Sequence, residues 1–288
     1  MAERKQEKVW LELQPYIDQP PVDPQQLYGR ACANDATTIT SWRETWTSQY
    51  RANHAIHGPF KNKSIGKLYK KHLHSPIFVV GSGPSLKKNA HQLVKKNGIP
   101  IISCLHNFHF LEDLGVDVDY YVNLDAGPIT IAEVAEGGNP EVDYWAKTKG
   151  KTLLAHVSSH PNLLAKWQGE ILFFNCPIPD VAIEEEFSKV EKFRTFVSSG
   201  GNVLGACLYI AKAFLGCSTK IFLGADFSFS YEEKFHGWDS SYDVKLGQVM
   251  RVRDIYGIPV KTWASYNNFK AWFDYVAMRV PGQYINAT

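Results

Sequence analysis

The sequence predicts an α/β protein with a Rossmann-like, doubly wound and mostly parallel sheet, preceded by an N-terminal helical extension. Three observations lead to this prediction. From residue 76 onward, short apolar runs alternate with stretches of helical periodicity, which is the pattern of parallel strands joined by helices. A glycine-rich turn directly follows the first apolar run. Residues 26–75, in contrast, have helical rather than strand periodicity.

The composition narrows the class of protein. The 288 residues are 44% hydrophobic and 21% charged, as in an ordinary globular protein, and the net charge of +2 does not favour nucleic-acid binding. No apolar run approaches the ~20 residues of a membrane span, and the charged N-terminus lacks the apolar core of a signal peptide. Five widely spaced cysteines indicate reduced thiols rather than a disulfide framework. We therefore expect a cytoplasmic location.

Two domains are predicted, a helical extension over residues 1–75 and a nucleotide-binding transferase domain over residues 76–288. Pro20, Pro21 and Pro24 mark a break within the extension. A basic stretch lies just before the first strand; its members are Lys61, Lys63, Lys67, Lys70, Lys71, His72 and His74. A solvated helix face explains this stretch, and contact with an acidic partner or a ligand phosphate is the alternative.

The elements of the second domain follow one another regularly. The apolar runs predict strands at 77–80, 101–104, 119–123, 152–156, 171–175, 220–225 and 258–260. The stretches between them predict helices at 86–97, 107–114, 129–136, 160–167, 180–192, 202–215 and 265–279. In such open sheets, ligands bind beyond the carboxyl ends of the strands, so the residues just after each strand are the candidates for a site.

The first of these strand ends carries the clearest signal. Gly81, Ser82, Gly83, Pro84 and Ser85 lead from a buried strand into a helix, with Ser85 as a candidate N-cap. Such a turn is an anion site, because free N–H groups and the helix dipole point to one spot. The alternative is that glycine serves only the tight turn. Leu at position 86, where a dinucleotide fingerprint needs a third glycine, and the lack of Gly-Lys-Ser/Thr argue against a nicotinamide dinucleotide site and a P-loop.

Polar residues follow the other strands as well. His106 and Asn107 follow the second predicted strand, Asp125 the third, and Asp226 the strand at 220–225. A second glycine turn, Ser199, Gly200 and Gly201, precedes an apolar helix, although the serine can also act only as a helix cap. Two glycine turns in one sheet fit a ligand with separated polar ends.

Two further patterns bear on catalysis and metal binding. Asp226 at a strand tip and His236 in the following loop can act as orienter and general base, although a loop histidine can also be merely exposed. Asp117 and Asp119 precede their strand and therefore lie at the wrong end of the sheet for a metal site. His156 and His160 have no evident third ligand.

Together these motifs resemble a known domain. Gly-Ser-Gly-Pro-Ser-Leu, Leu-Gly-Val-Asp-Val-Asp-Tyr-Tyr-Val-Asn-Leu-Asp, Ser-Ser-Gly-Gly-Asn-Val and Gly-Ala-Asp-Phe-Ser are similar to stretches of two related groups. One is the archaeal 6-hydroxymethylpterin pyrophosphokinases. The other is the motility-associated factor (Maf) glycosyltransferases, which attach nonulosonic sugars to flagellin. The closing residues 284–288 resemble a stretch after which the family continues with Glu-Gly-Gly. The resemblance covers residues 76–288.

The same order of motifs also resembles single-domain bacterial sialyltransferases. This resemblance implies that Gly81–Ser85 hold the phosphate and ribose of a CMP-sugar and that Asn107 contacts the sugar nucleotide. It implies that Ser199–Gly201 bind the nucleotide and that His236 is the general base for the acceptor hydroxyl. Tyr231 and Tyr242 are candidates to stabilise the leaving phosphate. No cofactor is implied.

The pyrophosphokinase resemblance implies a different reaction. The glycine turns would then hold ATP, and Asp125 and Asp226 would bind Mg²⁺, which prefers carboxylate and water ligands. Transfer of a sugar from a CMP-type donor to an unknown glycan or protein acceptor is the function we favour, because His236 follows the Asp-Phe strand end. Diphosphate transfer from ATP is the first alternative, and a non-catalytic interaction protein that keeps the fold is the second.

Overall fold

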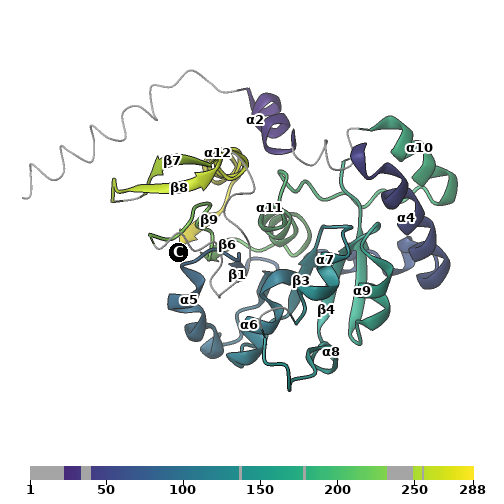
Figure 1. The fold of residues 1–288 in the computed structure, drawn as a ribbon, viewed down its shortest axis with the longest axis horizontal. Coiled ribbons are helices and arrows are strands. Elements are labelled where there is room, and N and C mark those ends of the chain that lie inside the picture. The colour runs from purple at the N-terminus through teal and green to yellow at the C-terminus, as the bar shows by residue number, and fades with distance from the viewer. Residues whose placement is uncertain (1–22, 34–39, 136–137, 178–179, 232–248, 255) are drawn as a thin grey trace, which may run out of the picture.

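A seven-stranded parallel sheet forms the centre of the molecule (Figure 1). The computed structural model describes residues 23–33, 40–135, 138–177, 180–231, 249–254 and 256–288. The strand order is β5-β4-β3-β2-β1-β6-β9, with every neighbouring pair parallel. The strands are β1 (Pro76–Val80), β2 (Ile101–Cys104), β3 (Tyr120–Asn123), β4 (Thr152–His156), β5 (Glu170–Phe174), β6 (Thr219–Leu223) and β9 (Gln283–Asn286). The predicted fold class is confirmed.

The last predicted strand has a different place from the one expected. The strand predicted at 258–260 overlaps β8 (Pro259–Trp263), which pairs with β7 (Val249–Arg253) in a separate antiparallel hairpin. The seventh strand of the sheet is instead β9, which pairs with β6 at the sheet edge. The prediction missed β9 because an edge strand is only half covered, and three of its four residues are exposed polar or aliphatic side chains rather than a buried run.

Helices cover both faces of the sheet. The α-helices of the described residues are α2 (Pro24–Ala31), α4 (Arg43–His57), α5 (Leu86–Asn89), α6 (Phe108–Asp113), α7 (Ile129–Ala132), α8 (Tyr144–Lys147), α9 (Pro161–Lys166), α10 (Val181–Val190), α11 (Val203–Tyr209) and α12 (Ala264–Arg279). The helix predicted at 86–97 is one α-helical turn followed by a 3₁₀ segment (Ala90–Lys95). Ser85 does not cap it through its side chain, because its hydroxyl bonds Asp226 instead.

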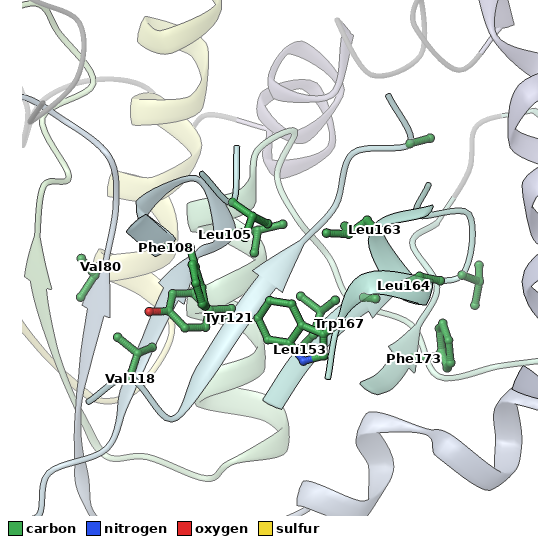
Figure 2. Close-up of a cluster of buried hydrophobic side chains, with 14 of the residues drawn as sticks. Val80, Leu105, Phe108, Val118, Tyr121, Leu153, Leu163, Leu164, Trp167 and Phe173 are labelled. Carbon is green, nitrogen blue, oxygen red and sulfur yellow. The ribbon is translucent and has the colours of Figure 1, made fainter. Parts of the chain in front are cut away.

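The inner strands of the sheet are buried from both sides because alternate residues enter two hydrophobic clusters. Val80, Tyr121 and Leu153 belong to the first cluster, and their neighbours Val79 and Leu154 belong to the second. Figure 2 shows part of the first cluster, in which the rings of Phe108 and Tyr121 are 4.8 Å apart and those of Phe108 and Trp167 are 5.6 Å apart. The second cluster lies between the sheet and α11. This two-sided burial is what parallel sheets require.

The N-terminal helices pack into the same clusters. Trp46 and Tyr50 of α4 are buried in the first cluster, and the Asn53 amide donates to the carbonyls of Val157 and Ser159 at 2.9 and 2.8 Å. Helix α4 therefore covers the segment that follows β4. The five lysines between residues 61 and 71 are exposed, as a solvated surface requires. No helix among the described residues has the length and apolarity to span a membrane.

Candidate functional site

The site lies where the direction of the strand order reverses. From β1 the chain builds β2 to β5 on one side, then returns to place β6 on the other side of β1. In open α/β sheets this switch point forms a crevice at the carboxyl ends of the strands. A crevice of about 320 Å³ is present there. It is lined by Gly81, Ser82, Gly83, Cys104, Leu105, His106, Val122, Asn123, Asp125, Glu133, Asn202, Val203, Leu204, Gly224, Ala225, Phe227, Ser228, Tyr266 and Phe269.

The first glycine turn forms the middle of the crevice and packs tightly on the end of β6. A Cβ on Gly81 would lie 2.4 Å from the Gly224 carbonyl oxygen, and one on Gly83 would lie 2.0 Å from Oδ2 of Asp226. Neither glycine has a positive φ. Glycine is needed here because the backbones after β1 and β6 approach each other more closely than a side chain allows. Gly81 and Gly83 also line the crevice, together with Ser82 between them.

Ser85 and Asp226 connect the same two strand ends through their side chains. The Ser85 hydroxyl donates to Oδ2 of Asp226 at 2.8 Å, and the Ser85 backbone N–H reaches the same oxygen at 3.3 Å. Burial raises the pKa of the Asp226 carboxyl, and the Ser85 hydrogen bonds partly oppose that shift. Neither residue lines the crevice, and neither does Pro84. Asp226 is therefore placed to hold the glycine turn.

Asn107 supports the glycine turn from the other side. Its side chain is fully buried, and its amide nitrogen donates to the carbonyls of Val80 and Gly81 at 3.3 and 3.1 Å and to the Ser103 hydroxyl at 3.0 Å. These bonds link the segment after β2 to the segment after β1. Asn107 does not line the crevice, so its predicted contact with a sugar nucleotide stays a prediction.

The second glycine turn is covered by helices. A Cβ on Gly200 would lie 2.2 Å from the Trp272 ring of α12, and one on Gly201 would lie 2.1 Å from the Ala31 carbonyl oxygen at the end of α2. Ser199 is buried and its hydroxyl accepts a bond from the Gly201 N–H. None of these three residues lines the crevice, whereas Asn202, the N-cap of α11, does. The turn thus positions α11 at the crevice.

Titratable side chains gather on the β2 and β3 side of the crevice. Nδ1 of His106 lies 3.1 Å from Oε1 of Glu133, and both side chains are about one-sixth exposed, at 17% and 16%. Asp125 follows β3, and its Oδ1 accepts from the Gly127 N–H at 2.8 Å. Although Asp125 reaches solvent at the surface of the crevice, the surrounding protein desolvates it, and this raises the pKa of its carboxyl. The negative charge of Glu133 acts in the same direction.

Aromatic side chains line the opposite side, after β6. Phe227 has a φ of 50°, which is uncommon for a residue with a side chain, and its carbonyl accepts from the Thr262 hydroxyl of β8 at 2.6 Å. Tyr266 and Phe269 come from α12, with their ring centroids 6.0 Å apart. The β7–β8 hairpin lies beside α12 in Figure 1, and together they hold this aromatic wall.

The remaining sequence predictions concern a general base, two tyrosines and a metal. His236 and Tyr242 lie outside the described residues. Tyr231 is 62% exposed, bonds Asp254 through its hydroxyl and does not line the crevice. For a metal, no group of three histidine, cysteine or acidic side chains with suitable placement occurs in the described ranges. Of the two carboxylates predicted for Mg²⁺, only Asp125 faces the crevice, because Asp226 is engaged by Ser85.

Several lining residues were not among the predicted site residues. His106 directly follows a strand end, and that position was a usable signal, but its partner Glu133 lies in a different segment and no sequence pattern connects the two. Tyr266 and Phe269 belong to α12, which packs beside the β7–β8 hairpin. Their positions in the sequence gave no indication that they reach the crevice. Asn202 could have been found as the polar residue that ends the second glycine turn.

The fold and crevice define a doubly wound α/β protein with a crevice at its switch point. Residues 50–232 match the family described as 6-hydroxymethylpterin diphosphokinase MptE-like, and the chain belongs to this family. A search of curated proteins found no match. Among solved structures, the chain is similar to a Maf glycosyltransferase from Magnetospirillum magneticum AMB-1, with 19% identity and a TM-score of 0.55. The similarity covers 75% of this chain and 33% of that one, so the chain spans about a third of that protein's length.

Proposed function

We propose that the protein is a glycosyltransferase that uses a nucleotide-sugar donor of the CMP type, with a nonulosonic sugar as the transferred group. The observation that carries the proposal is the order of the crevice walls. The glycine turn after β1 is in the middle, the aromatic wall is on the β6 side, and the titratable groups are on the β2 and β3 side. A ligand with a planar ring, a phosphate and a polar transferable group matches this order.

Each wall supplies the chemistry that one part of the donor needs. Phe227, Tyr266 and Phe269 offer apolar ring surfaces, on which a nucleobase can pack. A phosphate would lie against the glycine turn, where Gly81, Ser82 and Gly83 line the crevice. Asp125, after β3, lies where the sugar would sit and can hold its hydroxyls by charge-assisted hydrogen bonds, and His106, after β2, lies nearer the glycine turn.

In this proposal, Asp226 acts at a distance from the reacting atoms by fixing the glycine turn through Ser85. His236 keeps its predicted role as the general base that takes the proton of the acceptor hydroxyl. Cys104, Cys207 and Cys217 are thiols without a disulfide, which supports action in a reducing compartment such as the cytoplasm.

Diphosphate transfer from ATP is the second candidate, and the description of the matched family favours it. In that reaction Asp125 would hold Mg²⁺ together with the phosphates, since Mg²⁺ commonly uses one or two carboxylates plus substrate oxygens. Catalysis would then rest on positioning and on the charge of the metal. The two candidates differ in nucleotide and in metal dependence.

Ligand-induced stabilisation tests the choice between them. The thermal midpoint is measured with CMP, CDP, UDP, GDP and ATP, each with and without Mg²⁺. A ligand that binds the folded state stabilises it by about 2.7 kcal/mol at a hundredfold excess over its Kd. We expect a shift with CMP that is independent of Mg²⁺. A Mg²⁺-dependent shift with ATP alone would contradict the glycosyltransferase proposal in favour of diphosphate transfer. A flat result across the panel would indicate a non-catalytic interaction protein.

A further inference from the structure

The charge of the crevice poses a problem for any phosphate-bearing ligand. Among the described residues that line it, two are acidic, Asp125 and Glu133, and none is lysine or arginine. A leaving phosphate gains negative charge as its bond to the sugar breaks, and a hydrogen-bond donor, a proton or a cation close by stabilises that charge. In the lining as described, His106 is the one side chain that can carry a positive charge.

The position of His106 suits that task. It follows β2, which is the direct neighbour of β1, so it lies beside the glycine turn where the phosphate is proposed to bind. The next residue, Asn107, donates to the Gly81 carbonyl at 3.1 Å and thereby fixes the two segments relative to each other. The distance between His106 and the phosphate site is therefore set by buried hydrogen bonds.

Glu133 gives the His106 ring a defined orientation. Its Oε1 lies 3.1 Å from Nδ1, and both side chains are largely buried. A carboxylate that accepts from Nδ1–H selects the tautomer and offsets a positive charge on the ring. With the Nδ1 proton held by Glu133, a second proton on Nε2 makes the ring an imidazolium, and this second proton is the one that a ligand would receive. His109 is also close enough to interact electrostatically with His106, but it is buried and does not line the crevice.

We propose that His106, oriented by Glu133, is the general acid that protonates the leaving phosphate of the donor. The inference rests on the proposed glycosyl transfer. The bond between the anomeric carbon and the phosphate oxygen breaks, its electron pair stays on that oxygen, and Nε2 of His106 gives the oxygen a proton. The acceptor oxygen forms the new bond to the anomeric carbon, and its proton goes to the base. His106 regains its proton from solvent. Glu133 is a positioning residue, since it acts through His106.

The test uses CMP–N-acetylneuraminic acid as the donor probe and water as the acceptor, with release of CMP as the readout and an enzyme-free blank. Loss of a general acid costs roughly 10²–10⁴-fold in rate. We expect His106→Ala to lower kcat within that range, with KM for the donor within a few-fold of the original value. Glu133→Gln should also lower kcat and leave KM unchanged, and Glu133→Asp should restore part of the rate. His91→Ala, which changes an exposed histidine outside the crevice, is the matched control.

Rescue with free imidazole separates an acid from a base. Imidazole should restore the rate of His106→Ala more at a pH of about 6 than at about 8, because a larger fraction of the free imidazole is protonated at the lower pH. Greater rescue at the higher pH would assign His106 as a base and overturn the proposal, as would an unchanged rate in His106→Ala. If the unaltered protein binds CMP but releases none from the donor, or binds no CMP at all, the proposed glycosyl transfer itself fails, and this role of His106 fails with it.

Discussion

Ser85 and Asp226 join the ends of β1 and β6 by a hydrogen bond of 2.8 Å from the serine hydroxyl to the carboxylate. The two residues are far apart in the chain, yet the strand order makes their strands direct neighbours. The bond holds together the two strand ends that border the crevice at the switch point. A carboxylate predicted from its strand-tip position to act in catalysis thus has an evident structural role, which can be tested apart from any activity.

Asp226→Asn should change how stability depends on pH. Burial raises the pKa of the Asp226 carboxyl in the folded state above its unfolded value of about 3.9. The stability that this group contributes is therefore complete below pH 3.9 or so and is lost as the pH rises through the folded-state pKa. Relative to the unaltered protein, the free energy of unfolding of Asp226→Asn should increase between a pH of about 4 and 7, as measured by urea unfolding.

Asp117→Asn is the matched control for this prediction. Its hydrogen bond to Lys151 lowers the pKa of the Asp117 carboxyl, so its contribution to stability is present at neutral pH and is lost as the pH falls. The two variants should change in opposite directions relative to the unaltered protein. Parallel behaviour of the two would contradict the burial of Asp226.

Gly81→Ala should destabilise the protein even without ligand. The added Cβ would lie 2.4 Å from the Gly224 carbonyl oxygen, which is backbone and cannot move aside cheaply. Overpacking of this kind typically costs about 1–3 kcal/mol. Chemical denaturation measures the loss. Gly29→Ala in α2 is the control, because nothing lies within 4 Å of its Cβ position, and helical alanine is favoured over glycine by about 0.5–1 kcal/mol. Equal stability of Gly81→Ala and the unaltered protein would show that the two strand ends are not in contact.

His156 should make the protein sensitive to acid. The side chain is fully buried, with its ring 4.7 Å from that of Trp46, and burial lowers the pKa of the imidazole to about 3. The folded state therefore keeps His156 neutral while the unfolded chain protonates below a pH of about 6.5. As the pH falls below that value, this one group should remove about 1.4 kcal/mol of stability per pH unit until the folded-state pKa is reached.

His156→Gln tests this slope. The variant loses packing and is less stable at neutral pH, but its free energy of unfolding should fall less steeply between a pH of about 6 and 4. The comparison uses urea unfolding at several pH values and considers only the difference in slope. An equal slope in both proteins would mean that His156 is accessible to protons in the folded state.

Much of the fold could be predicted because buried parallel strands are short apolar runs. The runs that became β1 to β6 are bounded by turn residues, and each was found within one or two positions. β9 could not be found in this way, since an exposed edge strand such as Gln283–Asn286 needs no apolar run. β8 was found but misplaced, because its pairing with β7 depends on contacts that a local pattern does not contain.

The candidate site was predictable only in part, for a related reason. The residues that follow strands in the sequence also meet at one edge of the sheet, and Gly81, Gly83 and Asp125 line the crevice there, as the strand-end rule leads one to expect. The roles of Asn107 and Asp226 in bracing the turn follow from burial, which the sequence does not reveal. The covering of Gly200 by Trp272 depends on where α12 packs.

Binding of CMP in the crevice is the most direct test of the central claim. Val203 lines the crevice at the start of α11, so Val203→Trp should fill the space that the nucleotide needs. Val181→Trp, at a position that is 71% exposed on α10, is the matched control. The measurement is the thermal midpoint of all three proteins during titration with CMP. We expect the midpoint of the unaltered protein and of Val181→Trp to rise with CMP, and that of Val203→Trp to stay constant. A rise in Val203→Trp as large as that of the unaltered protein, or no rise in any of the three, would contradict a nucleotide site at this switch point.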